Sequence, residues 1–552
     1  MEWVDADLPV PECSYVELLE SSLRAFGGRP AAHFLGVTQS FADIEALSAR
    51  FASFLVDAGC GPGDIVAVNL PNSLQFIIAQ MGALRAGCIA SGLSFLLSPR
   101  EMGQQLKDCG ARVLVTLDRT FEQKFMRIRD EMPGLTHVVV TNIADFLPGY
   151  KRVLGRLAGR IPTGRIVPVP GKDIVPFMRI MADWPARAPK VERSPEDTCL
   201  IQYTGGTTGV PKGAELTHGN LVASIGQIAQ WLKQGRGRHV YCCAFPYFHI
   251  AGAAMSMHAL STGNAQIVIP DPRDTRYICR EMRRYSPTSM FNVPSLYHML
   301  LREPAFHALA FSSFEGCLAA AAPFAAETYR ELETATRGAQ VGSGYGLTEA
   351  AGFLTLDLYG GRKKIGASGV PVQNTRIKLV DLDTGTQEVP QGQEGQIIAR
   401  GPQVMKGYYR NAEETALALR EFEGERWLYT GDVGRMDEDG YLFVVDRVKD
   451  MVNVGGYKVF SRLVEDVLNE HPAVQRCAVL GVPNPDRPGS ELVKAAVELT
   501  PAYGDRPGRG LSGELVKHCR ENLAAYEVPT VFEFVTELPL TAVGKVDKKA
   551  IR

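Results

Sequence analysis

One short segment of the chain has the residue types of a phosphate-binding loop. Tyr203–Gly213 (YTGGTTGVPKG) contains four glycines, three threonines and one lysine, and it has no acidic residue. Glycine permits the positive φ angles with which backbone N–H groups can surround an anion, and Lys212 adds a positive charge. A Walker loop would need Gly-Lys-Ser/Thr, whereas Pro211 precedes Lys212 here. The segment predicts an anion site, with a flexible surface loop as the alternative.

Two further segments have residues that suit a nucleotide and an apolar ligand. In Val341–Glu349 an aromatic ring between two glycines could stack on a base, and Glu349 is an oxygen ligand of the kind Mg²⁺ prefers. A glycine-rich turn with a capping glutamate is the alternative. From Pro246 to Pro270 there is no Asp, Glu, Lys or Arg. Its small residues could leave room for an apolar ligand, but residue types alone favour close helix packing.

The elements around these segments alternate between strand and helix. Ser40–Asp43 has the spacing of a capping box and predicts a helix that ends near Gly59. The pattern then predicts strands at 65–70, 113–115, 138–140 and 199–203, and helices at 74–86 and from 216 onward. Such alternation indicates an α/β fold in which helices cover parallel, buried sheets.

The residues from about 430 onward have a different organisation. A hairpin is predicted with its turn at Asp439-Gly440, and the charged run Asp446–Asp450 has the composition of an exposed linker. A helix near Val464 and strands at 478–482 and 492–499 suffice for a small α+β domain. We therefore predict a large N-terminal domain of several subdomains (1–446), a linker (447–450) and a small C-terminal domain (451–552).

Composition narrows the class of protein. The 552 residues are too many for one core, and 59 basic against 61 acidic residues give no reason to expect nucleic-acid binding. The eleven cysteines form no Cys-x-x-Cys pair, which indicates a reducing compartment and no zinc site. No signal peptide or bilayer-spanning run is evident, so a cytoplasmic protein is expected.

One basic segment stands out from this balance. Six Lys or Arg and no acidic residue lie between Phe146 and Lys172, interleaved with apolar residues. A solvated basic helix is the favoured interpretation, and peripheral contact with an anionic membrane is the alternative.

The motifs, taken in order, resemble those of the adenylate-forming superfamily of acyl-CoA synthetases, luciferases and peptide-synthetase adenylation domains. The segments that carry the resemblance are 203–213, Pro246-Tyr-Phe-His249, 345–349, Tyr429-Thr-Gly-Asp432, 446–450, Gly455-Gly-Tyr-Lys458 and Gly544-Lys-Val546. The form at 202–209, followed by 216–221, is most similar to bacterial medium- and long-chain fatty acyl-CoA synthetases. Several motifs in the right order and spacing are stronger evidence than any one of them.

The resemblance implies a function and a set of site residues. The reaction would activate a carboxylic acid with ATP and Mg²⁺ to an acyl adenylate, and coenzyme A would then displace AMP. Lys545, Glu349, Thr204 and His249 would be catalytic, with Thr204 and Glu349 also placing the metal. The nucleotide would be bound by Thr204, Gly205, Gly206, Thr207, Thr208, Gly209, Lys212, Gly344, Tyr345, Gly346, Thr348, Asp432 and Arg447. Lys449 would be the hinge of a mobile C-terminal domain, Gly455, Gly456 and Lys458 would line the coenzyme A channel, and Phe248, His249, Gly252, Ala320 and Ala321 would line the acyl pocket.

Two segments depart from the family pattern. Ala319–Ala322 replaces a turn that usually contains glycine, and the extra methyl would narrow the site. Ser461-Arg-Leu463 replaces a Pro-x-Glu segment, which leaves the cap of the following helix in question. Aryl or alicyclic carboxylate–CoA ligases and a non-catalytic fatty-acid-binding relative are the alternatives to a fatty acyl-CoA synthetase, and monomer and homodimer both stay open.

Overall fold

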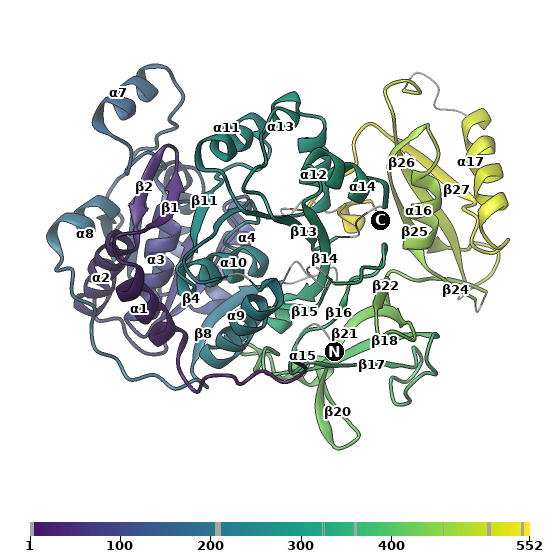
Figure 1. The fold of residues 1–552 in the computed structure, drawn as a ribbon, viewed down its shortest axis with the longest axis horizontal. Coiled ribbons are helices and arrows are strands. Elements are labelled where there is room, and N and C mark those ends of the chain that lie inside the picture. Colours follow the sequence, from purple (N-terminus) through teal and green to yellow (C-terminus); the bar gives the residue numbers. More distant parts are fainter. Residues whose placement is uncertain are drawn as a thin grey trace. The chain divides into compact units, whose positions relative to one another are not determined.

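The computed structural model describes residues 5–204, 211–233, 235–322, 324, 326–357, 361–455, 457–488, 490–504, 509–541 and 546–551. The chain divides into two compact units (Figure 1). The first unit comprises 1–206, 210–375 and 400–417, and the second comprises 207–209, 376–399 and 418–552. The fold is the mixed α/β architecture that the sequence predicts, while the hinge at 447–450 stays a prediction.

An eight-stranded sheet in the first unit ends at the predicted phosphate loop. Its spatial order is β19 (Gly407–Tyr408), β9 (Gly213–Thr217), β8 (Thr198–Tyr203), β4 (Ile89–Gly92), β3 (Ile65–Asn69), β5 (Val113–Leu117), β6 (His137–Thr141) and β7 (Asp173–Pro176). Strands β8 to β7 are parallel, and β9 and β19 are antiparallel to their neighbours. Strands β3 and β4 are buried along their whole length, as expected of strands covered on both faces.

A nine-stranded sheet forms the other layer of the first unit. Its order is β16 (Val370–Pro371), β15 (Gly352–Leu356), β14 (Gln340–Leu347), β13 (Gly316–Ala320), β12 (Ser289–Asn292), β10 (Val240–Cys243), β11 (Ala265–Val268), β1 (Pro30–Phe34) and β2 (Val37–Ser40). The strands from β14 to β1 are parallel, which places the carboxyl ends of β10, β13 and β14 on one edge of the sheet.

Helices cover these sheets and pack on one another. The helices of the first unit are α1 (Tyr15–Phe26), α2 (Phe41–Asp57), α3 (Leu74–Arg85), α4 (Pro99–Cys109), α5 (Asp118–Thr120), α6 (Met126–Ile128), α7 (Gly149–Leu157), α8 (Phe177–Asp183), α9 (His218–Leu232), α10 (Ile250–Ser261), α11 (Thr275–Tyr285), α12 (Pro294–Leu301), α13 (Pro304–His307), α14 (Ala326–Ala335) and α15 (Ala412–Ala418), with the short turns η1 (Phe121–Phe125), η2 (Arg129–Glu131) and η3 (Thr348–Ala350). Helix α2 packs on α3, and α1 packs on α9 and α10. The predicted capping box of α2 is confirmed, because Ser40 and Asp43 each accept a hydrogen bond from the other's backbone N–H.

The second unit contains three small sheets. A five-stranded sheet is built from β17 (Arg376–Val380), β18 (Glu394–Arg400), β20 (Leu419–Phe422), β21 (Glu425–Met436) and β22 (Leu442–Arg447). A two-stranded ribbon, β23 (Val452–Val454) and β24 (Tyr457–Val459), leads to α16 (Ser461–Asn469). The remaining elements are β25 (Val474–Pro483), β26 (Glu491–Leu499), α17 (Arg509–Asn522), β27 (Val531–Val535) and the turn η4 (Lys548–Ala550).

Three local expectations need correction. The segment 341–349 is not a free turn, because β14 runs through Leu347 and pairs with β13 and β15. Strand β9, which follows the phosphate loop at Gly213, was not expected. The run 446–450 is not wholly an exposed linker, because β22 continues to Arg447 and Asp446 is buried. In each case pairing with a distant strand outweighs the local composition.

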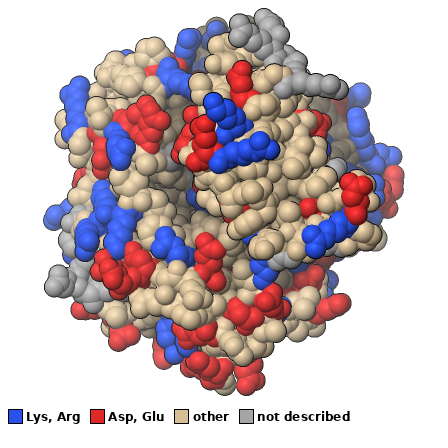
Figure 2. Space-filling view, turned by 90° about the vertical axis from the view of Figure 1, so that its right-hand side faces the viewer, with Lys and Arg blue, Asp and Glu red and all other residues tan. Residues whose placement is uncertain are grey.

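Three further observations concern the surface charges, the cysteines and the apolar character of the helices. Basic and acidic side chains are interspersed on the face shown in Figure 2. All eleven cysteines are free thiols, and ten of them are buried. Among the described residues, no helix has both the length and the apolar composition needed to cross a bilayer.

Candidate functional site

The ends of the predicted phosphate loop are joined by backbone hydrogen bonds. Strands β8 and β9 pair at Tyr203 and Gly213, and the Thr204 N–H donates to the Lys212 carbonyl oxygen at 2.9 Å. Thr204 and Lys212 are both half-buried. Gly205, Gly206, Thr207, Thr208 and Gly209 lie outside the described residues, so their predicted phosphate contacts remain predictions.

Lys212 lies between an acidic and an aromatic side chain. Its ammonium group forms an ion pair with Glu414 of α15 and lies 5.4 Å from the centre of the Tyr408 ring. The side chain of Lys212 is only 23% exposed. Partial burial strengthens such charge and cation–π interactions relative to water.

Glu349 belongs to the same group of side chains through Tyr408. The Tyr408 hydroxyl donates to Glu349 Oε1 at 2.6 Å, and the Met405 N–H donates to the Glu349 carbonyl oxygen at 2.8 Å. Strand β19 lies beside β9, with Tyr408 opposite Ala214. This pairing allows Tyr408 to contact Lys212 with its ring and Glu349 with its hydroxyl group. We call Lys212, Glu349, Tyr408 and Glu414 the Lys212 cluster.

Sequence reasoning found Lys212 and Glu349 but missed Tyr408 and Glu414. Tyr408 follows Lys-Gly in a segment with no distinctive spacing, and Glu414 is one of two adjacent glutamates at the start of α15. The positions lie 59 and 202 residues from their partners, so pairing them required the fold.

The Lys212 cluster fits an anionic ligand that brings a cation with it. No group of three or more His, Cys, Asp and Glu in the described parts of the chain could hold a metal ion by itself. A Mg²⁺ ion commonly takes one or two carboxylates and completes its shell with substrate phosphates and water. Glu349, with the nearby start of the phosphate loop at Thr204, fits that kind of site better than a permanent metal centre.

Neutralising Glu414 is expected to favour nucleotide binding. A polyphosphate that binds Lys212 must compete with the Glu414 carboxylate, and a partly exposed ion pair is worth up to about 1 kcal/mol. We expect Glu414→Gln to lower the KM for ATP about two- to fivefold with little change in kcat. Initial-rate kinetics with varied ATP test this expectation, with Glu413→Gln as the matched control on the same helix turn. A KM that rises would show that Glu414 supports the ATP-bound state.

The glycines of β14 are explained by the approach of β15. A Cβ at Gly346 would lie 1.8 Å from the carbonyl oxygen of Gly352, and one at Gly344 would lie 2.5 Å from the Leu356 side chain. The strand pairing has a bulge between Tyr345 and Gly346. The bulge and the missing side chains fix the direction of Tyr345 at the edge of the sheet. Thr348, which follows in η3, is buried.

The alanine-rich departure places a strained residue next to β13. Ala320 is the buried last residue of the strand, and Ala321 has a φ angle of +71°. This left-handed conformation costs a residue with a Cβ about 1–2 kcal/mol. Glycine would adopt this conformation without that cost.

Introducing a glycine at position 321 should stabilise the protein. We expect Ala321→Gly to raise the free energy of unfolding by about 0.5–1 kcal/mol, the relief of strain less the greater unfolded-state entropy of glycine. Denaturant titration of the variant and of an Ala320→Gly control measures the change. The control should be destabilised, because Ala320 is a buried strand residue; equal effects of the two substitutions would contradict the strain argument.

His249 and Phe248 are held at the entry to α10. His249 is the N-cap residue, and its Nδ1 accepts a hydrogen bond from the Ala251 N–H at 3.3 Å. The Asn72 side chain, which sequence reasoning missed, donates to Phe245 O at 2.9 Å and accepts from the Tyr247 N–H at 2.7 Å. A Cβ at Gly92 would lie 2.7 Å from Phe248 Cα. The end of β4 in one sheet therefore supports the turn after β10 in the other.

Gly252 has a packing role in this structure. A Cβ at this position would lie 2.2 Å from the Pro246 carbonyl oxygen. Every other residue of α10 except Ala251 is buried as well. The small residues of α10 thus serve close packing, as residue types alone favour, and the predicted contact of Gly252 with an acyl group remains a prediction.

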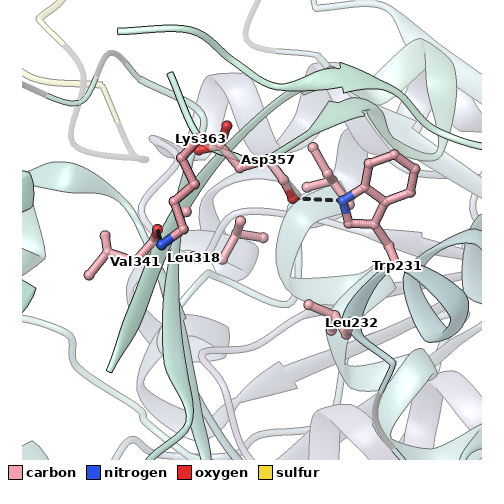
Figure 3. Close-up of a pocket in the computed structure, with 8 residues that line it drawn as sticks. Trp231, Leu232, Leu318, Val341, Asp357 and Lys363 are labelled. Carbon is pink, nitrogen blue, oxygen red and sulfur yellow. Dashed lines mark hydrogen bonds between the residues drawn. The ribbon is translucent and has the colours of Figure 1, made fainter. Parts of the chain in front are cut away.

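A small pocket lies along β13 and β14, further back on the strands that carry Ala320 and Gly344 (Figure 3). Its lining residues are Trp231, Leu232, Leu318, Val341, Gly342, Leu356, Asp357 and Lys363. Leu318 lies two residues before Ala320 on β13, and Gly342 lies two residues before Gly344 on β14. Two residues span about 7 Å of a strand. The pocket walls are mostly aliphatic and aromatic.

Polar groups lie at one side of this pocket. The Trp231 indole N–H donates to the Asp357 carbonyl oxygen at 2.7 Å, and Lys363 Nζ donates to Val341 O at 2.7 Å (Figure 3). The Asp357 carboxylate accepts hydrogen bonds from the Ser343 N–H and hydroxyl at 2.8 and 3.1 Å. Burial raises the pKa of Asp357 to about 6, although the Ser343 hydrogen bonds and the charge of Lys363 act to lower it.

In the second unit, two predicted nucleotide residues form an ion pair. Asp432 of β21 and Arg447 of β22 lie opposite each other, and Arg447 Nε donates to Asp432 Oδ1 at 2.8 Å. Asp432 is buried and Arg447 is 42% exposed. The hairpin and this ion pair thus orient the Asp432 carboxylate.

The other predicted residues of the second unit lie further along the chain. Lys449 is exposed in the turn after β22, and Lys458 of β24 forms an ion pair with Asp383 at 2.6 Å. Gly455 has a φ angle of +63°, and its N–H donates to Ser490 Oγ at 2.9 Å. Gly456 and the predicted catalytic Lys545 lie outside the described residues.

The helix whose cap the sequence left in question is capped from a distance. The N-cap residue of α16 is Phe460, which makes no side-chain cap hydrogen bond. Instead, the Asp446 carboxylate accepts from the Ser461 hydroxyl at 3.2 Å and from the Arg462 N–H at 3.3 Å. Burial raises the pKa of Asp446, and the hydrogen bonds and the charge of Lys548 oppose this shift. An acidic group at a helix N-terminus is stabilising, so the departure leaves the helix intact.

Lys548 connects the C-terminal segment to the same helix. Its Nζ lies 2.7 Å from both Ser461 Oγ and Glu465 Oε1. Burial raises the pKa of Glu465, while its ion pair with Lys548 acts in the opposite direction. Glu465 is the one acidic residue that this segment shares with the usual family pattern, and the structure gives it a role in holding the chain end.

Comparisons with known proteins cover nearly the whole chain. The family described as AMP-binding enzyme matches residues 19–409, and AMP-binding enzyme C-terminal domain matches residues 463–545. A long-chain-fatty-acid–CoA ligase of Bacillus subtilis (strain 168) is 35% identical, with 99% of this chain and 95% of that protein aligned. A feruloyl-CoA synthase of Amycolatopsis sp is 33% identical, with 94% of each chain aligned.

A solved structure agrees with these relationships. The anthranilate CoA ligase AuaEII, determined in complex with anthranoyl-AMP, superimposes with a TM-score of 0.83 and 28% identity over 99% of this chain and 97% of that one. The resemblance inferred from the motifs is confirmed. From both family matches and the full-length relatives, the chain belongs to the AMP-binding, adenylate-forming superfamily of enzymes and is an AMP-forming acid–thiol ligase that makes acyl-CoA through an acyl adenylate.

Proposed function

We propose that this enzyme activates a medium- or long-chain fatty acid. In the first step a carboxylate oxygen of the acid attacks the α-phosphorus of ATP, and pyrophosphate leaves. In the second step the thiol sulfur of coenzyme A attacks the acyl carbon, and AMP leaves. The observation that carries the proposal is the 35% identity, over 99% of this chain, to a long-chain-fatty-acid–CoA ligase, and the small apolar pocket along β13 and β14 is consistent with it.

The position of this pocket suits an apolar chain attached to the reacting carboxylate. Ala320, which is predicted for the acyl pocket, is the last residue of β13, and it lies opposite Gly344 of β14, which is predicted for nucleotide binding. The cavity is only about 10 Å³, so an acyl chain that runs back along the strands past Leu318, Val341 and Leu356 toward Trp231 requires these side chains to move aside. Such walls bind an apolar chain through burial of surface, about 0.8 kcal/mol for each CH₂ group.

The remaining roles follow from the clusters in each unit. Lys212 and the loop 204–209 bind the β- and γ-phosphates, and Glu349 with Thr204 holds Mg²⁺, which when bound offsets the negative charge that develops on the phosphates. Tyr345, Gly344, Gly346 and Thr348 bind the adenine side. Asp432 accepts the ribose hydroxyls, and Arg447 supports it. Gly455, Gly456 and Lys458 line the path of the pantetheine arm. The acyl pocket is lined by Phe248, His249, Gly252, Ala320 and Ala321, with His249 beside the acyl carboxylate.

An aryl acid is the second candidate substrate, because an aromatic side chain in the pocket can also pack against the ring of such an acid. The Trp231 indole lines the pocket, and the relatives include a feruloyl-CoA synthase and an anthranilate CoA ligase. The eleven cysteines are free thiols and most of them are buried. Free thiols are typical of a reducing compartment, which favours a cytoplasmic location whether the acid is a fatty acid or an aryl acid.

A panel of acids from benzoate through butyrate and octanoate to palmitate separates the two candidates. Pyrophosphate release should rise from butyrate to the longer acids if the substrate is a fatty acid, whereas a maximum at benzoate or another aryl acid would overturn that proposal. Gly342 allows a sharper test. A Cβ there would lie 3.4 Å from Asp357 Cβ and 3.6 Å from Leu318 Cδ1, so alanine fits but takes up pocket volume.

We therefore expect Gly342→Ala and the larger Gly342→Leu to reduce kcat/KM progressively for octanoate and palmitate and to leave butyrate within about twofold. The short acid serves as the internal control for folding and for ATP binding. An equal loss with all acids would show that the pocket along β13 and β14 does not hold the acyl chain.

A further inference from the structure

Helix α7 presents an apolar face that no described part of the chain covers. Tyr150, Val153, Leu154 and Leu157 lie at helical spacing on one face, and they are 65, 58, 62 and 81% exposed. None of the nine residues of α7 is buried. In Figure 1 the helix lies at the end of an excursion between β6 and β7, away from the layered body of the first unit.

A helix as short as α7 is not expected to be stable in water on its own. Helices shorter than about 12 residues are marginal in water without tertiary packing of their apolar face. Some support comes from Ile161, which folds back so that a Cβ at Gly155 would lie 2.5 Å from its side chain, and from the Arg160 N–H, which donates to the Gly155 carbonyl oxygen at 2.9 Å. The exposed apolar face therefore indicates that something outside the described chain covers it.

The charges within the segment that carries α7 are of one sign, and an acidic contact to it comes from Glu122 of η1, which accepts a hydrogen bond from the Arg165 N–H at 3.2 Å. Lys151, Arg152, Arg156, Arg160 and Arg165 flank the apolar face, and no acidic residue lies between Phe146 and Lys172. The two nearest acidic residues along the chain are engaged elsewhere. Asp145 accepts hydrogen bonds from Thr141 and Asn142, and Asp173 pairs with His137.

The basic surface continues onto α11. Lys151 Nζ and Arg284 Nη1 lie 3.4 and 2.8 Å from the position that a Cβ would take at Gly36, in the turn between β1 and β2. Arg283 and Arg284 are exposed at the end of α11. The acidic neighbours on this side are Glu303, beside Arg276, and Glu281, which is buried beside Arg280. The excess of positive charge thus extends beyond α7 itself.

We propose that α7 is an interfacial helix that docks the enzyme on an anionic lipid surface. An apolar face with an aromatic residue, flanked by Lys and Arg and free of acidic residues, is the composition of helices that lie in the plane of a membrane interface. Anionic headgroups complement the basic flanks, whereas a soluble protein partner or a second copy of this chain would need an acidic or apolar surface of matching shape. The inference does not depend on which acid the enzyme activates.

Vesicle flotation of the full-length protein tests this inference. The probes are vesicles of equal parts phosphatidylglycerol and phosphatidylcholine, and vesicles of phosphatidylcholine alone. Wild type should float with the anionic vesicles and much less with the neutral ones. Each Lys or Arg near an anionic surface contributes about a fivefold factor, so Arg156→Glu/Arg160→Glu should lower the partition coefficient at least about 25-fold.

Matched variants separate the contributions of charge and apolar contact. Leu154→Asn/Leu157→Asn should lower partitioning about tenfold, and Leu154→Met/Leu157→Met should retain it. The control Lys517→Glu/Arg520→Glu makes the same change of charge on two exposed residues of α17 and should float like wild type. Thioester formation with a water-soluble acid should stay the same in all of them, because α7 contains no residue of the catalytic or binding machinery.

Three results would overturn the inference. The first is wild type that remains with the soluble fraction in the presence of anionic vesicles, and the second is a set of α7 variants that float as well as wild type does. In the third, sedimentation velocity would show that the leucine-to-asparagine variant changes from dimer to monomer while its flotation is unaltered, which would identify the face as a contact between copies of this chain.

Discussion

Lys545→Ala is expected to abolish adenylate formation and to spare the second half-reaction. An ammonium group that bridges the acid carboxylate and the α-phosphate stabilises charge in the transition state, and its loss costs on the order of a few kcal/mol, or about 10²- to 10³-fold in rate. Formation of acyl-CoA from preformed acyl adenylate should stay within about twofold, because the α-phosphate is then part of the leaving group. Pyrophosphate release and a single-turnover thioester assay measure the two steps separately.

Two variants control for charge and for folding. Lys545→Arg keeps the positive charge with a different geometry and should recover only part of the adenylation rate. Lys549→Ala removes an exposed lysine from the neighbouring turn η4 and should leave both steps unchanged. If Lys545→Ala slowed both half-reactions equally, or neither, Lys545 would not be the adenylation lysine.

Lys449→Pro is expected to have the opposite profile. Lys449 lies in a turn in which the Val448 N–H donates to Gly431 O at 2.9 Å and the Asp450 N–H donates to Arg447 O at 3.0 Å. Proline would fix φ near −65° at this position and would restrict Val448 to extended conformations. If the turn is the hinge of a mobile C-terminal domain, adenylation should stay within about twofold while thioester formation slows at least about tenfold.

The alanine variant at the same position separates the hinge from the side chain. Lys449→Ala removes the charge but leaves the backbone free, so both half-reactions should proceed close to the wild-type rates. A proline variant that is impaired in adenylation alone would contradict the hinge assignment. An alanine variant as slow as the proline variant would show that the ammonium group, and not backbone rotation, is what matters.

Much of the local structure could be predicted from sequence because its causes are local. The capping box at Ser40 and the β-branched run at Ile65 each specify an element within a few residues, and both elements occur in the structure. The order and spacing of the motifs likewise identified the superfamily before any fold was known. By contrast, the apparent glycine-rich turn at 341–349 is a strand, because β13 and β15 supply hydrogen-bond partners that composition does not reveal.

The candidate site divides in the same way. The sequence alone indicated which residues are candidates for the chemistry, since Lys212, Glu349, Asp432 and Lys545 are recognisable by type and by motif, and their roles remain predictions. Tertiary structure decided which side chains these residues contact. Tyr408 and Glu414 contact Lys212, and Arg447 forms an ion pair with Asp432. Asp446 likewise caps a helix that begins 15 residues later. The sequence does not reveal these partners, because they are far apart along the chain. Hydrogen bonds and ion pairs need distances of about 3 Å, and only the packing of the strands brings the side chains that close.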